Sequence, residues 1–211
     1  MLETIRRALL PLLFSFASAA GATTIQFNFT GNVTDDAING CGGVVACGAV
    51  TGSYVFDNAA PDGNAAVDIG LYAATSITLS IDGSLFFSAA NGVINVANFA
   101  AVDQYGLLAL GGTANNGSAA DLSVLLQDFT GTAFSTDALP LTPSALALLL
   151  PGGFTLNASD DSFQLLGLIT SISCSRDCGG VIPVSEPPLV LLFATGLVVA
   201  CLRRRPYQQI L

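Results

Sequence analysis

The stretch Ser76-Ile-Thr-Leu-Ser-Ile-Asp-Gly-Ser-Leu-Phe-Phe87 carries the clearest fold signal in this chain. Its isoleucines and its first leucine alternate with serine and threonine, a period of two that is typical of a half-buried β-strand. The Asp82-Gly83 pair between two apolar runs predicts a hairpin with a type I′ turn, because both central residues of that turn need positive φ.

The same alternation recurs along the middle of the chain, and one segment differs from it. Further strands are expected at residues 24–30, 50–56, 92–96, 105–110, 121–126, 154–156 and 163–173. Thr142 as N-cap, Pro143 and a run of Ala and Leu, stopped by Pro151-Gly152, predict a short helix. The fold class is therefore expected to be mainly β, a single antiparallel β-sandwich with one short helix and a β-barrel as the alternative.

The composition favours turns and strands and excludes nucleic-acid binding. Between residues 23 and 184 there are thirteen aspartates, no Glu and no Lys, and Arg176 is the one basic residue. Asp, Asn, Gly, Ser and Thr supply turns, whereas Glu and Lys favour exposed helices. Phosphate binding depends on Lys and Arg, so a surface this acidic repels nucleic acid and anionic membranes.

The N-terminal segment has the three parts of a secretory signal peptide. Arg6 and Arg7 precede a short apolar run, and a zone of small residues follows that suits cleavage after Ala19 or Ala22. The apolar run is too short for a spanning helix. We therefore expect a signal peptide at residues 1–22 and an exported body.

The C-terminal segment also has three parts: the polar motif Ser185-Glu186-Pro187, an apolar run at residues 189–202, and the cluster Arg203-Arg204-Arg205. The run is shorter than the roughly 20 residues that usually span a bilayer, but arginines can snorkel and the bilayer can thin locally. The arginines place this end in the cytoplasm. A transmembrane helix is expected, and an ordinary membrane anchor is one interpretation of it.

The order and spacing of these parts resemble the PEP-CTERM sorting domain of Gram-negative bacteria, with Ser185-Glu186-Pro187 standing where the family shows Pro-Glu-Pro. The resemblance implies that an exosortase cuts near Glu186-Pro187 and releases the body to the cell surface or extracellular matrix. The expected organisation is a signal peptide (1–22), a β-sandwich ectodomain (23–178), a linker with the sorting motif (179–188), a transmembrane helix (189–202) and a basic cytoplasmic tail (203–211).

The cysteines fall into two closely spaced pairs. Cys41 and Cys47 form one pair, Cys174 and Cys178 the other, and each lies in a glycine-rich or polar stretch. In an oxidising compartment such pairs predict two local disulfides. A four-thiolate zinc site is the alternative if the two pairs meet in space.

The residues needed for catalysis are mostly missing. The chain has no His, so neither a Ser-His-Asp nor a Cys-His arrangement can form. The doublets Asp35-Asp36 and Asp160-Asp161 are poor acid–base pairs for glycoside hydrolysis, because adjacent strand residues point to opposite faces. We expect no enzyme and no catalytic residues.

The sequence also suggests a calcium loop built from aspartates and an asparagine. Asp57, Asp62, Asn64 and Asp68 place oxygen ligands within a short segment, as calcium prefers. The spacing does not fit an EF-hand, and a plain acidic loop is the alternative.

Two functions remain open for the body. The first is a non-enzymatic surface or matrix protein, whose partners are the exosortase, the membrane before processing and extracellular polysaccharide. The second is a carbohydrate-binding, lectin-like module on a plain membrane anchor, since sandwiches host such sites on their loops. Sugar platforms need exposed aromatic rings, for which Tyr72 and Tyr105 are the candidates.

Overall fold

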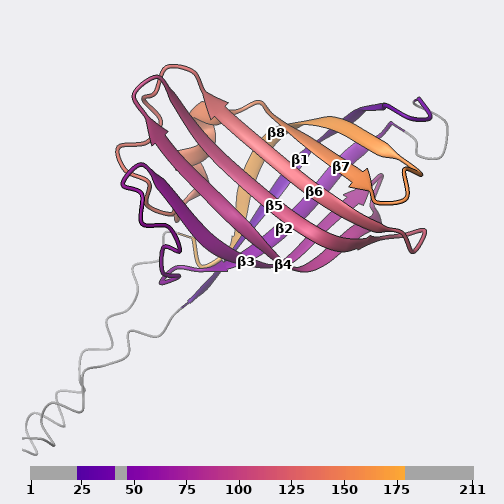
Figure 1. Ribbon diagram of the computed structural model, residues 1–211, viewed down its shortest axis with the longest axis horizontal. Coiled ribbons are helices and arrows are strands. Elements are labelled where there is room, and N and C mark those ends of the chain that lie inside the picture. The colour runs from indigo at the N-terminus through magenta and orange to yellow at the C-terminus, as the bar shows by residue number, and fades with distance from the viewer. Residues whose placement is uncertain (1–22, 41–46, 179–211) are drawn as a thin grey trace, which may run out of the picture. The chain divides into compact units, whose positions relative to one another are not determined.

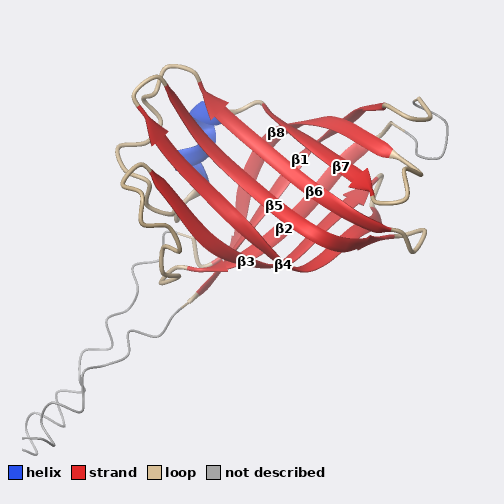
Figure 2. Ribbon diagram, viewed as in Figure 1, coloured by secondary structure: helices blue, strands red, loops and turns tan. Residues whose placement is uncertain are grey.

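The computed structural model describes residues 23–40 and 47–178, which form eight strands and one short helix. The strands are β1 (Thr24–Asp36), β2 (Ala49–Asp57), β3 (Ile69–Ile81), β4 (Ser84–Phe99), β5 (Val102–Ala114), β6 (Ala119–Asp128), β7 (Gly152–Ala158) and β8 (Gln164–Arg176). The helix η1 (Pro143–Leu149) is a 3-10 helix between β6 and β7. Figure 2 shows how strands dominate. The predicted mainly β fold with one short helix is confirmed.

The strands close into a barrel instead of packing as a sandwich. Each strand pairs antiparallel with the next one, and β8 pairs with β1 along residues 26–36 of β1. Figure 1 shows the strands curving around a common interior. The sandwich prediction is wrong and its alternative, the barrel, is correct. The alternation of inward and outward side chains is the same in both architectures, so the sequence pattern does not distinguish them.

The hairpin at Asp82-Gly83 forms as the sequence predicts. Asp82 has φ of 48° and Gly83 has φ of 79°, and Ile81 pairs with Ser84 across the turn. The Asp82 carboxylate also accepts the Ala49 N–H at 2.9 Å, which ties the hairpin to the start of β2. The strand after the turn is longer than expected, because β4 joins the two predicted strands at 85–87 and 92–96.

Aromatic rings and aliphatic chains from all eight strands fill the interior. Phe27 packs edge-on against Phe56 with ring centroids 5.1 Å apart, and against Tyr54 at 5.9 Å. The inward glycines leave room for such rings: a Cβ at Gly52 would clash with the ring of Phe29. These closely packed side chains form the hydrophobic core of the protein inside the barrel.

Different residues cover the two ends of the barrel. At the end where β6 and β8 finish, η1 contacts β5, β6 and β8 and buries Leu146 and Leu149. At the end of the Asp82-Gly83 turn, Phe86 and Phe163 meet edge-to-face with centroids 5.3 Å apart. Apolar contacts therefore cover the core at both ends.

The start of η1 differs from the prediction in one respect. Pro143 occupies the start of the helix as expected, but Thr142 makes no side-chain capping hydrogen bond. Its hydroxyl lies 3.0 Å from that of Ser144 instead. A 3-10 helix of seven residues packed by two buried leucines forms without that cap.

Candidate functional site

The outer wall of β1, β2 and β3 carries a patch of neutral hydrogen-bonding side chains that we term the hydroxyl–amide face. Its members are Asn28, Thr30, Thr51, Ser53, Thr78 and Ser80, which line a shallow depression of about 280 Å³ together with Phe29 and Gly52. No member carries a charge. The face offers hydrogen-bond donors and acceptors that do not titrate near neutral pH.

The strand register arranges these side chains in two rows. Asn28, Ser53 and Thr78 are cross-strand partners in one row, and Thr30, Thr51 and Ser80 are partners in the other. Rows of this kind repeat the strand spacing of about 4.8 Å, which gives a regular array on the barrel wall.

Some hydroxyls of the face bond to one another or to the next strand. The Ser53 and Thr78 hydroxyls lie 3.0 Å apart, and the Thr30 hydroxyl lies 2.6 Å from that of Ser171 on β8. Each hydroxyl has one donor and two acceptor positions, so these contacts leave capacity for a ligand or water. The arrangement can bind polar, uncharged groups, and it contains no nucleophile–base pair.

The two tyrosines expected as sugar platforms are buried. Tyr105 is 1% exposed and Tyr72 is 7% exposed, so neither can stack on a ligand at the surface, and that prediction is wrong. Burial raises the pKa of Tyr105, and burial followed by repulsion from Asp62 and Asp137 raises the pKa of Tyr72. Both tyrosines occupy inward positions of their strands: Tyr72 lies between Gly70 and Ala74 on β3, and Tyr105 lies between Asp103 and Leu107 on β5.

The residues of the predicted calcium loop serve as turn acceptors. Asp57 accepts the Ala59 N–H at 2.8 Å, and Asn64 accepts the Ala66 N–H at 3.2 Å. The Asp62 Oδ1 accepts two N–H groups at 2.8 Å, from Asn64 and Leu71.

Within residues 23–40 and 47–178, no three side chains of His, Cys, Asp or Glu gather as a metal-binding group. The Asp68 side chain is exposed, and its carbonyl oxygen accepts the Asn98 N–H at 2.9 Å. A calcium site built from Asp57, Asp62, Asn64 and Asp68 stays a prediction.

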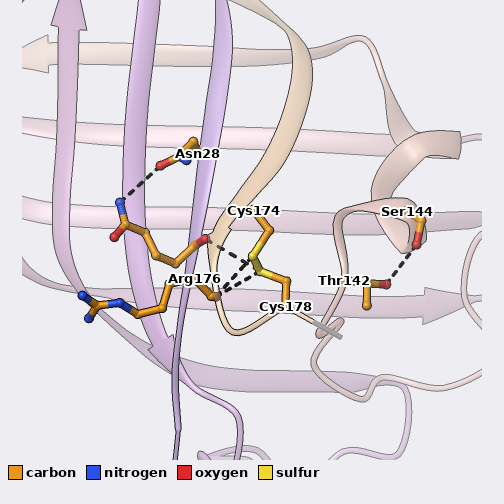
Figure 3. Close-up of a disulfide and its surroundings, with 7 residues drawn as sticks. Asn28, Thr142, Ser144, Cys174, Arg176 and Cys178 are labelled. Carbon is orange, nitrogen blue, oxygen red and sulfur yellow. Dashed lines mark hydrogen bonds between the residues drawn. A yellow bond between two sulfur atoms is a disulfide. The ribbon is translucent and has the colours of Figure 1, made fainter. Parts of the chain in front are cut away.

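The disulfide between Cys174 and Cys178 is present, as predicted, with Cα atoms 5.9 Å apart (Figure 3). Each sulfur lies 3.2 Å from the Arg176 carbonyl oxygen. Because a disulfide sulfur carries no hydrogen, these are close contacts and not hydrogen bonds. Cys47 is itself disulfide-bonded, but Cys41 lies outside the described residues, so the Cys41–Cys47 pairing stays a prediction.

The first aspartate doublet, Asp35-Asp36, separates as strand geometry predicts. Asp35 is exposed, whereas Asp36 is buried and accepts the N–H groups of Ile38, Asn39 and Gln164 at 3.1–3.3 Å. Burial alone would raise the pKa of Asp36, but these bonds and the Asn39 amide outweigh it and lower the pKa. The Asp36 carboxylate therefore stabilises the turn that follows β1.

In the second doublet, Asp160 accepts the Ser118 hydroxyl at 2.6 Å. That bond, with bonds from Ser162, lowers the pKa of Asp160 to about 2. Asp161 follows with φ of 57° in the turn before β8. Asp160 thus stabilises this turn, and Asp161 is part of its backbone.

The segments that carry the targeting predictions lie outside the described residues. They are the signal peptide at 1–22, the motif Ser185-Glu186-Pro187, the apolar run at 189–202 and the cluster Arg203-Arg204-Arg205. In the part of the chain that the structure describes, no helix has the length and apolar character needed to cross a membrane.

Sequence reasoning missed the hydroxyl–amide face. Its members occupy the polar positions of the alternating pattern, which indicate only that they point away from the core. Their neighbour relations depend on the register between β1, β2 and β3, and no pattern within one strand contains that register. No protein family, curated protein or solved structure matches this chain.

Proposed function

We propose that this chain is an exported surface or extracellular-matrix protein of a Gram-negative bacterium, with a non-enzymatic barrel as its body. In this proposal the signal peptide directs export, and an exosortase processes the C-terminal signal around Ser185-Glu186-Pro187. The Cys174–Cys178 disulfide is the structural observation that supports export, since such bonds persist in oxidising compartments. The body carries thirteen aspartates and one basic residue, Arg176, and this excess of negative charge fits a soluble, well-solvated surface.

The intact mass of the protein recovered from the cell surface tests the sorting step. We expect a mature species that lacks the residues beyond about Glu186. Replacing Arg203, Arg204 and Arg205 by Ser should prevent processing, because the arginines orient the apolar run.

The variant Arg176→Ser is the matched control, since it removes an arginine from the exposed end of β8 and leaves the sorting signal intact. A mature species that retains Arg203, Arg204 and Arg205 would mean that the segment is an ordinary anchor.

A second function is favoured by the hydroxyl–amide face: the barrel binds a neutral polysaccharide there. The observation is the pair of rows, Asn28 with Ser53 and Thr78, and Thr30 with Thr51 and Ser80. Sugar hydroxyls both donate and accept, as these side chains do. The acidic surface disfavours an anionic polysaccharide by repulsion, so the expected ligand class is uncharged.

Substitution of the central strand of the face tests this second function. The double variant Thr51→Val and Ser53→Ala should weaken binding to an immobilised neutral glucan at least about tenfold, since each hydrogen bond contributes about 0.5–1.5 kcal/mol. The control variant Thr155→Val and Ser123→Ala makes the same chemical changes in a cross-strand pair of β6 and β7. Equal loss in both variants, or loss in neither, would contradict binding at this face.

A further inference from the structure

Two acidic side chains lie next to each other inside one end of the barrel. Asp103 of β5 and Asp128 of β6 are cross-strand partners, and both are buried, with exposed fractions of 0% and 8%. Asn98 of β4 is the partner of Asp103 on its other side. Directly opposed side chains have Cβ atoms about 4.5–5.5 Å apart, so the three side chains lie in one short row.

Asp103 is incompletely paired. Its Oδ2 accepts the Phe134 N–H at 2.8 Å, while its Oδ1 is buried without a hydrogen-bond partner among the described residues. A buried carboxylate oxygen left unpaired is costly, and the cost falls when a cation or a proton compensates the charge. No basic side chain compensates the charge of Asp103, because Arg176 is the one Lys or Arg between residues 23 and 178 and it is exposed.

Asp128 adds a second negative charge to the same place. Its carboxylate accepts the Thr130 hydroxyl at 2.7 Å, the Thr130 N–H at 2.9 Å and the Thr132 N–H at 3.0 Å. All three donors stabilise the negative charge of the Asp128 carboxylate. Like charges directly opposite each other destabilise a strand pair.

We propose that Asp103, Asp128 and Asn98 form a calcium site that bridges β4, β5 and β6 at this end of the barrel. A bound cation would compensate both carboxylates and pair the free oxygen of Asp103. The loop after β6 supplies neutral oxygens close by: the Thr132 hydroxyl lies 3.3 Å from Asp128 Oδ2.

An all-oxygen set selects a hard cation, since it contains no thiolate or imidazole. Calcium tolerates irregular geometry with six to eight oxygens, whereas magnesium needs a near-ideal octahedron. Two carboxylates on a stable scaffold suggest a Kd of roughly 0.1–1 mM, the range of extracellular calcium modules.

This site differs from the exposed loop that the sequence suggested, and one pair of variants separates them. Asp103→Asn removes one charge from the buried row and keeps the shape of the side chain. Asp62→Asn makes the same chemical change in the exposed loop. In the full-length chain, 10 mM calcium chloride should raise the melting temperature of the wild type by about 3–11 °C, because calcium binds only the folded state.

The calcium shift should persist in Asp62→Asn and disappear in Asp103→Asn. A shift retained in Asp103→Asn, or lost in Asp62→Asn alone, would overturn the proposal. A wild type that does not respond to calcium would also overturn it.

A measurement on the wild type covers the case in which Asp103→Asn does not fold. The Phe134 N–H donates to Asp103, and the Asn64 N–H donates to Asp62 with the same length of 2.8 Å. Titration with calcium chloride, followed by amide NMR, should shift the Phe134 resonance saturably and leave that of Asn64 in place. The reverse pattern, or no saturable shift, contradicts a site at Asp103.

Discussion

Tyr54 on β2 and Tyr105 on β5 meet inside the barrel, with hydroxyl oxygens 2.8 Å apart although 51 residues separate them in sequence. The two strands are not neighbours in the barrel order, so this hydrogen bond crosses the interior instead of running along the wall. Both side chains are almost completely buried. Each hydroxyl therefore depends on the other for its hydrogen bond.

Removing one of these hydroxyls should cost more than removing both. Tyr54→Phe leaves the Tyr105 hydroxyl buried and unpaired, which we expect to lower the free energy of unfolding by about 1–3 kcal/mol. The double variant with Tyr105→Phe should be no less stable than either single variant, because no unpaired hydroxyl remains. Urea denaturation of the four proteins measures this coupling, and additive losses would contradict it.

Substitution of Gly83 should destabilise the protein because of the backbone conformation at this position. Its φ is 79° and no atom lies where a Cβ would be, so Gly83→Ala should cost about 1 kcal/mol through the backbone alone. The control is Gly153→Ala, at a strand position with ordinary φ and space for a methyl group, where stability should be unchanged or slightly higher. Thermal melting compares the two, and equal losses would argue against the type I′ turn.

Acid should destabilise the protein through Asp160. The Ser118 hydroxyl and then the bonds from Ser162 lower its pKa from an ordinary 3.8 to about 2 in the folded protein. The unfolded chain therefore binds more protons between these values, and the free energy of unfolding rises with pH there. The contribution of Asp160 is complete above about pH 4 and is lost as the pH falls through about 2.

Denaturant unfolding between pH 2 and 5 measures this effect. Ser118→Ala should flatten the pH dependence, because it removes the largest cause of the lowered pKa and leaves the carboxylate in place. An unchanged slope in Ser118→Ala would show that the Ser118 hydroxyl does not stabilise the ionised form of Asp160.

The Cys174–Cys178 bond should stabilise the end of β8 modestly. A closed loop this short removes only about 2 kcal/mol of chain entropy from the unfolded state by the loop-closure relation. The double variant Cys174→Ser and Cys178→Ser should therefore fold, with a slightly lower melting temperature. Peptide mapping without reductant identifies the bond, and free thiols at both positions would contradict it.

Several features could be predicted because their causes lie within a few residues of each other. The alternation from Ser76 to Ile81 marks a strand face, and the Asp82-Gly83 pair supplies the positive φ values of the turn. Cys174 and Cys178 are four positions apart, so one local turn is enough to bring them together, and Pro143 begins a helix by fixing its own φ.

The sequence by itself thus determined a mainly β body, the Asp82-Gly83 turn, one local disulfide and the position of the helix. Only the tertiary structure decided that β8 closes on β1, that Tyr54 reaches Tyr105, and that Asp103 lies opposite Asp128. A period of two indicates which face of a strand is buried, but it is identical in a sandwich and a barrel. Strand order and register depend on contacts across the whole body, and these contacts assemble both the hydroxyl–amide face and the buried acidic row.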